Sequence, residues 1–161
     1  MTIEEYNQSL DLYSDGLKRF VERLTMNNSR AEDIVQDTYE NLWIKLDKIQ
    51  NSNLKSYLFH SAYQFFLKDK MRDSLIYKEN IDSESDYNHT PAYTDIKDIL
   101  HQAIDTLTPV QKTAIILKEY EGFEYEEIGE MMEETTLQVK QHVFRARVAL
   151  QKYLVKSDNV I

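Results

Sequence analysis

The sequence predicts an all-α protein made of two small helical domains joined by a flexible linker. Three glycines and two prolines in 161 residues leave few positions for the tight turns that β-hairpins need. Apolar residues recur at three- and four-residue spacing over long stretches, which is typical of amphipathic helices. A polar, acidic stretch without this period interrupts the pattern and divides the chain into residues 1–74, 75–97 and 98–161.

In the first domain, the spacing predicts three helices. Residues 13–24 carry one apolar stripe, and the Asn27-Asn28-Ser29 turn ends it. Ser29 is the expected N-cap of the second helix, with Glu32 completing a capping box. The polar residues 51–53 end that helix, and a third helix follows.

In the second domain, a helix is expected to resume near Asp95, with Ile96 and Ile104 among its core residues. Thr108-Pro109 is a threonine N-cap followed by proline at the first helical position, and this helix should stop near Gly122. A short helix over 125–132 and a final helix over about 137–154 complete the domain.

Composition excludes several classes of protein. The chain has no cysteine, which rules out disulfide scaffolds, thiol enzymes and cysteine zinc sites. It has no phosphate-binding glycine motif, and its four histidines lie on separate predicted elements without metal-ligand spacing, so neither an enzyme nor a cofactor is expected. No apolar run approaches the ~20 residues of a membrane span. We therefore expect a cytoplasmic protein with no membrane partner.

The formal net charge of −9 argues against nucleic-acid binding by the chain as a whole, but the charge is unevenly placed. Eight glutamates fall within residues 119–134, where Lys and Arg are absent. The final helix that follows is basic. A short helix, a capped turn and then a basic helix is the layout of a helix-turn-helix whose second helix enters the major groove of DNA.

The final helix has a buried seam and an opposite, polar face. Val139, Val143 and Ala146 recur at helical spacing and form the seam. Glutamine can pair with adenine, arginine with guanine, and lysine can neutralise phosphate. Arg147 is expected instead to pair with a glutamate of the preceding helices. The candidate readers of duplex DNA are Thr136, Gln138, Lys140, Gln141, Phe144 and Arg145.

The first domain offers two further candidate surfaces. The helix over 31–43 has an acidic face suited to a basic protein surface. The segment over 56–72 interleaves aromatic and basic residues, which is a pattern suited to single-stranded bases. We expect Leu58, Ala62 and Phe65 in the core. Core packing and base stacking both stay open for the other rings, which are Tyr57, Phe59, Tyr63 and Phe66.

Two segments resemble a known family. Residues 31–43 read AEDIVQDTYENLW, and this resembles region two of bacterial sigma-70-family factors. Residues 107–154 resemble region four, where VFRARVAL follows a helix containing Glu-Glu-Ile-Gly. Regions one and three have no counterpart, which is the architecture of the extracytoplasmic-function (ECF) group. The resemblance implies a non-enzymatic alternative sigma factor that directs core RNA polymerase to promoter DNA.

The resemblance also implies roles for particular residues. Docking on the β′ clamp helices of core RNA polymerase falls to Asp33, Gln36, Asp37, Glu40 and Trp43. Contact with the melted −10 strand falls to Tyr57, Phe59, Tyr63, Phe66, Lys68, Lys70 and Arg72. Reading of the −35 element falls to the final-helix residues named above, and the β flap is the expected polymerase contact of the second domain. The acidic linker resembles the family's segment in the RNA exit path.

Charge adds two expectations and one alternative stays open. Few cations face the groove, so the chain alone should bind promoter DNA weakly. An anti-sigma factor or an auxiliary DNA-targeting recruiter is therefore expected as a further partner. The alternative function is a stand-alone helix-turn-helix regulator whose first domain binds a protein or ligand.

Overall fold

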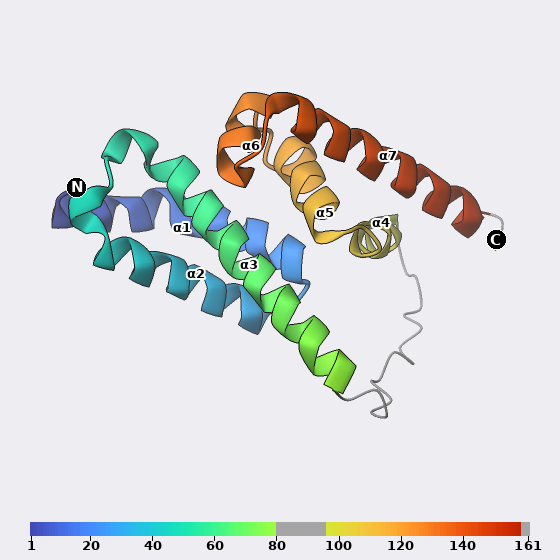
Figure 1. Cartoon of the computed structure of the whole chain (residues 1–161), viewed down its shortest axis with the longest axis horizontal. Coiled ribbons are helices and arrows are strands. Elements are labelled where there is room, and N and C mark those ends of the chain that lie inside the picture. Colours follow the sequence, from blue (N-terminus) through green and yellow to red (C-terminus); the bar gives the residue numbers. More distant parts are fainter. Residues whose placement is uncertain (80–95, 159–161) are drawn as a thin grey trace.

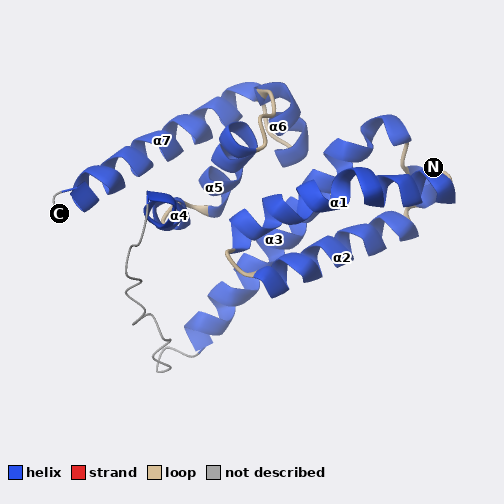
Figure 2. Ribbon diagram, turned by 180° about the vertical axis from the view of Figure 1, so that it is seen from behind, coloured by secondary structure: helices blue, strands red, loops and turns tan. Residues whose placement is uncertain are grey.

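The computed structural model describes residues 1–79 and 96–158, which are helical apart from short connections and contain no strand (Figures 1 and 2). The predicted all-α class is confirmed. Most of the predicted linker lies outside the described residues. The helices are α1 (Ile3–Thr25), α2 (Asn28–Ile44), α3 (Leu54–Glu79), α4 (Ile96–Asp105), α5 (Pro109–Ile115), α6 (Tyr125–Met132) and α7 (Thr136–Asp158). The short turns are η1 (Leu46–Lys48), η2 (Asn51–Asn53) and η3 (Ile116–Tyr120), of which η3 has π-helical hydrogen bonding.

The first domain consists of α1, α2 and α3. α1 and α2 run antiparallel, and α3 packs against both of them (Figures 1 and 2). The predicted stripe on α1 is buried, and Phe20 and Leu24 have no exposed surface. Each fully buried side chain of this size contributes about 1.5–3 kcal/mol to folding. The residues that complete this core include Ile34 and Leu42 of α2 and Leu58, Ala62 and Phe66 of α3.

Two boundaries in the first domain differ from the predicted ones. Asn27, not Ser29, caps α2, and its side chain accepts a hydrogen bond from the Arg30 N–H at 3.1 Å. The prediction was wrong because Met26 adopts a left-handed conformation (φ 54°) and reverses the chain at once, which places Asn27 at the cap. α3 continues past Ser74 to Glu79, since no glycine or proline stops it there.

The second domain has the predicted helix-turn-helix. Thr108 caps α5 in a capping box with Gln111, and Pro109 is the first helical residue, as predicted. Ile96 is 83% exposed, so its predicted place in the core is wrong, because no neighbouring helix covers the first turn of α4. Gly122, with φ 72°, follows η3 and turns the chain toward α6.

Gly129 sets the turn between α6 and α7. A Cβ atom at this position would lie 2.7 Å from the Glu134 carbonyl oxygen, closer than packed atoms approach. The Glu134 N–H donates to the Gly129 carbonyl at 2.9 Å, which closes the turn. Only glycine permits this approach, so Gly129 fixes how α7 leaves α6.

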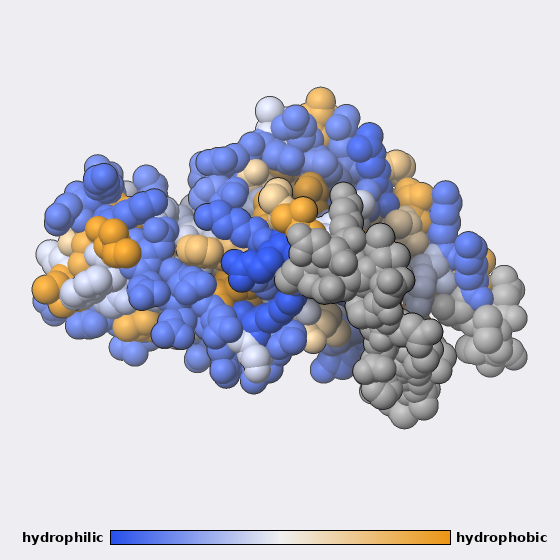
Figure 3. All heavy atoms as spheres, turned by 60° about the horizontal axis from the view of Figure 1, so that its bottom comes forward, coloured by the Kyte–Doolittle hydropathy of each residue, from blue (hydrophilic) through white to orange (hydrophobic). Residues whose placement is uncertain are grey.

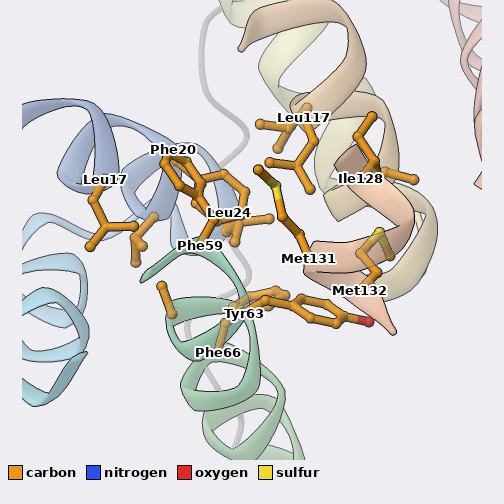
Figure 4. Close-up of a cluster of buried hydrophobic side chains, with 14 of the residues drawn as sticks. Leu17, Phe20, Leu24, Phe59, Tyr63, Phe66, Leu117, Ile128, Met131 and Met132 are labelled. Carbon is orange, nitrogen blue, oxygen red and sulfur yellow. The ribbon is translucent and has the colours of Figure 1, made fainter. Parts of the chain in front are cut away.

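The two domains share one buried apolar cluster. Phe59 of α3 contacts Phe20 of α1 and Phe123, with ring centroids 5.1 and 5.2 Å away. Figure 4 shows Met131 and Met132 of α6 directed toward α3. On the face drawn in Figure 3, exposed apolar side chains lie scattered among hydrophilic ones. The domains therefore meet through their interiors.

Candidate nucleic-acid and protein interfaces

The acidic face of α2 lies on the outside of the first domain. The alternate residues Ile34, Thr38 and Leu42 are buried, which turns the remaining positions outward. Trp43 is 48% exposed and is held by an edge contact with Tyr6, with ring centroids 5.1 Å apart. All five predicted docking residues are exposed along this face, namely Asp33, Gln36, Asp37, Glu40 and Trp43.

Negative charge accumulates around Asp37. Partial burial raises the pKa of its carboxyl group, and the neighbouring carboxylates of Glu40, Asp33 and Asp69 raise it further. Arg72 opposes them. The surface of α2 therefore holds more negative charge than its own cations balance, and a cationic partner would relieve that repulsion.

An arginine anchors α2 to α3. The Arg30 guanidinium donates two hydrogen bonds to the Asp73 carboxylate, at 2.5 and 2.6 Å, and its Nε lies 3.6 Å from Asp69. This bidentate pair lowers the pKa of Asp73 below its ordinary value. It holds the two helices on either side of a hollow of about 550 Å³ that Asp37, Lys68 and other polar residues line.

The predicted single-strand residues of α3 fall into two groups. Phe59, Tyr63 and Phe66 are buried, with exposed fractions of 3%, 4% and 0%. The others reach the surface to differing degrees: Lys68 and Arg72 are exposed, and Tyr57 and Lys70 are half-buried. The three buried rings offer no free face to a base in this arrangement of the domains.

Phe65 is a candidate that sequence reasoning placed in the core. It is half-buried and lines the α2–α3 hollow and also a second hollow of about 300 Å³ beside it. The Lys68 ammonium group lies 5.5 Å from the centre of its ring. The lysine three residues later was the available signal, because residues three apart share a helix face.

The second hollow combines an aromatic wall with hydrogen-bonding groups. The Asn41 amide donates to the Tyr57 hydroxyl at 2.8 Å, and Ser61 lies within 3.4 Å of the same amide. Other lining residues are Lys45, His60, Gln64, Phe65 and Lys68. An apolar ring, an amide and cations together suit a nucleobase and its phosphate.

The exposed face of α7 carries the predicted duplex readers. Val139, Val143 and Ala146 are buried as predicted. The outward residues are Lys140, Gln141, Phe144 and Arg145, while Thr136 is half-buried at the first turn of α7.

Two of the polar residues of α7 are already engaged within the domain. The Gln138 side-chain oxygen accepts from the Thr135 N–H at 2.9 Å in a capping box, which leaves only its amide donors free. Arg147 pairs with Glu119, which confirms the expected glutamate partner. The remaining arginine of this face, Arg145, makes no ion pair with any residue in the described ranges.

Other kinds of site were searched over the described ranges. No group of three or more His, Cys, Asp or Glu among residues 1–79 and 96–158 could hold a metal ion. Within the same part of the chain, no helix is both long enough and apolar enough to span a membrane.

Comparison with known proteins identifies the family. The profile of Sigma-70 region 2 matches residues 10–74, and that of Sigma-70, region 4 matches residues 97–150. The chain is 30% identical over 141 residues to the RNA polymerase sigma factor SigV of Bacillus subtilis, covering 82% of this chain and 80% of that protein. It is 29% identical over 157 residues to the ECF RNA polymerase sigma factor SigE of Mycolicibacterium smegmatis, covering 91% of this chain but only 60% of that relative.

A solved structure agrees with these matches. The sigma factor RpoE of Bartonella quintana, crystallised with the anti-sigma factor NepR, matches with a TM-score of 0.77 at 30% identity. The match covers 94% of this chain and 98% of that one. The chain therefore belongs to the bacterial sigma-70 family of RNA polymerase sigma factors, in its extracytoplasmic-function group.

Proposed function

We propose that this chain is an alternative sigma factor that binds core RNA polymerase and directs it to promoters. The observation that carries the proposal is the pairing, in one chain of this family, of an exposed acidic face on α2 with an exposed basic reader on α7. A stand-alone regulator has no need of the first of these surfaces.

The division of labour follows the two domains. Residues 1–74 dock on the β′ clamp helices through the α2 face and contact the melted −10 strand through α3. Residues 98–161 read the −35 element with α7 and meet the β flap. The linker over 75–97 connects these tasks. The exposed Arg145 and Lys140 support the reading role, since free donors at a helix surface are what base edges and phosphates require.

Further partners are part of the proposal. The Bartonella quintana relative forms a complex with an anti-sigma factor, and we extend that kind of partner to this chain. Because the chain carries a net charge of −9 and few cations on α7, we propose weak autonomous DNA binding and reliance on polymerase or an auxiliary recruiter. The place of action is the cytoplasm, where polymerase and promoters meet.

The proposal is tested by reconstitution with purified core RNA polymerase. The chain should bind core in a pull-down and support run-off transcription from a promoter selected with the reconstituted enzyme. The double variant Asp37→Lys and Glu40→Lys should weaken core binding at least tenfold, or ~1.4 kcal/mol, because it places cations against a basic partner.

A matched control separates docking from net charge. Glu4→Lys with Asp11→Lys makes the same charge change on exposed positions of α1 and should leave core binding within twofold of the original chain. Absence of core binding by the unchanged chain would refute the proposal. Specific operator binding without polymerase would then favour the stand-alone regulator.

A further inference from the structure

The junction between the two domains is held at one edge by Arg23 of α1. Its Nη1 lies 3.0 Å from the Glu121 carboxylate, and its guanidinium lies 4.4 Å from the centre of the Tyr120 ring. The Glu121 side chain is only 8% exposed. One arginine of the first domain thus makes both an ion pair and a cation–π contact with the second.

The opposite edge is held by His60 of α3. Its Nδ1 lies 2.7 Å from the Met131 carbonyl oxygen, to which it donates, and its Nε2 lies 3.5 Å from the Glu133 carboxylate. Both acceptors belong to the C-terminal end of α6 and the turn after it. The junction is therefore closed by polar contacts on both sides of an apolar layer.

The apolar layer covers part of the predicted single-strand surface. Phe123 packs edge-on against Phe59, with Lys55 of α3 4.8 Å from the centre of the Phe123 ring. Figure 4 shows the Tyr63 ring extending toward Met132. Burial in this layer raises the pKa of Tyr63 to about 12. A base cannot stack on Phe59 or Tyr63 while α6 lies over α3.

The other two proposed surfaces are not covered. The α2 face and the outward residues of α7 are exposed in the same arrangement. From this asymmetry, we infer that the free chain is self-masked: its second domain covers the Phe59–Tyr63 segment of α3 and must move away before single-stranded DNA binds there. This inference rests on the proposed function of α3.

The masking has a defined consequence for order and affinity. Polymerase docking through α2 and duplex contact through α7 are available to the closed chain, whereas contact with the melted strand requires the open one. The apparent affinity for single strands is reduced by the fraction of chains that are open. Because the Arg23 and His60 contacts lie at the rim of the junction, changing one of them should shift that fraction without disrupting either core.

A charge swap tests the closure directly on the full chain. The chain has no cysteine, so Ser52→Cys and Gln151→Cys, both at exposed positions, supply one dye site in each domain. The labelled chain should show a single high-transfer population. Arg23→Glu should move it toward low transfer, and the double variant Arg23→Glu with Glu121→Arg should restore high transfer, because the ion pair is re-formed with reversed sign.

Binding of fluorescein-labelled single-stranded DNA of mixed sequence supplies the second measurement. Arg23→Glu should bind it at least threefold more tightly than the original chain despite its lost positive charge, and the charge-swapped double variant should return to within twofold. Arg19→Glu, which makes the same charge change at an exposed position of α1, should bind no more tightly than the original chain.

Two results would overturn the inference. One is a low-transfer population in the unchanged chain, and the other is an open Arg23→Glu chain that binds single strands no better. If Arg23→Glu is unfolded by circular dichroism, Glu121→Ala provides the same two measurements with a milder change. Core polymerase binding is measured separately, so its failure would refute the proposed function and leave the closure result standing.

Discussion

Arg147 on α7 pairs with Glu119 on η3, whereas Arg145, two positions earlier on the same helix, points to solvent without an ion pair in the described ranges. Pairing cancels the charge of Arg147 and fixes its direction. The two arginines therefore differ in what they can offer to DNA.

Arg145→Ala should weaken binding of the reconstituted holoenzyme to its −35 element by about 1–3 kcal/mol and relax selection at one base pair. The reason is the loss of paired donors that match guanine. The measurement is competition binding with duplexes that carry single base-pair changes. Arg147→Ala is the matched control and should leave base selection unchanged. Equal weakening on every duplex would make Arg145 a phosphate contact instead.

Gly129→Ala should destabilise the second domain by about 1–3 kcal/mol, because the new Cβ meets the Glu134 carbonyl oxygen at 2.7 Å. Urea unfolding followed by circular dichroism measures this. Gly16→Ala serves as the control, since the nearest atom to its Cβ is an arginine nitrogen at 3.5 Å. That change lies inside α1 and should stabilise by about 0.5–1 kcal/mol. Equal effects of the two substitutions would contradict the close approach.

Lys112→Met should leave the free energy of unfolding unchanged or raise it by about 1 kcal/mol. Lys112 is 3% exposed, and burial lowers its pKa although Asp105 binds its ammonium group at 2.8 Å. The Asp105 side chain is 57% exposed, so water solvates it once the lysine is gone. Urea unfolding of this variant beside Lys152→Met, at an exposed position, makes the comparison. A loss above about 1 kcal/mol would show that the ion pair outweighs the cost of burial.

Two of the eleven tyrosines, Tyr39 and Tyr63, should ionise last in an alkaline titration, since burial raises the pKa of each to about 12. The folded state holds these protons more tightly than the unfolded chain, in which the tyrosine pKa is about 10. Their contribution to stability is therefore complete below pH ~10 and is lost as the pH rises through about 12.

Ultraviolet absorbance of tyrosinate records this titration. Tyr63→Phe should remove one of the two late ionisations, and Tyr57→Phe should remove neither. Ionisation of all tyrosines in one early step, while circular dichroism still shows folded helices, would contradict the burial of these two rings.

Helical periodicity was sufficient to predict the α2 face and the α7 seam. In both helices the apolar residues occupy one side, so the opposite side must face outward whatever the helix packs against. The capped turn at Thr108-Pro109 was predictable for a similar reason, because its signal lies within a few residues of sequence. The α2 cap was not, since it depends on the left-handed turn at Met26.

α3 shows where such reasoning stops. Its aromatic residues surround the helix, and no period distinguishes Phe65, which lines two hollows, from Phe66, which has no exposed surface. Their environments are set by α1 and α2 on one side and by α6 on another, and these helices are distant in sequence.

The sequence by itself determined the helical class, the two candidate surfaces on α2 and α7, and the family, because each depends on local spacing or on a contiguous motif. Only the tertiary structure decided which rings of α3 are covered and that Arg23 and His60 contact the second domain. Those features depend on how two separately patterned domains meet, and local periodicity carries no record of a partner surface more than fifty residues away.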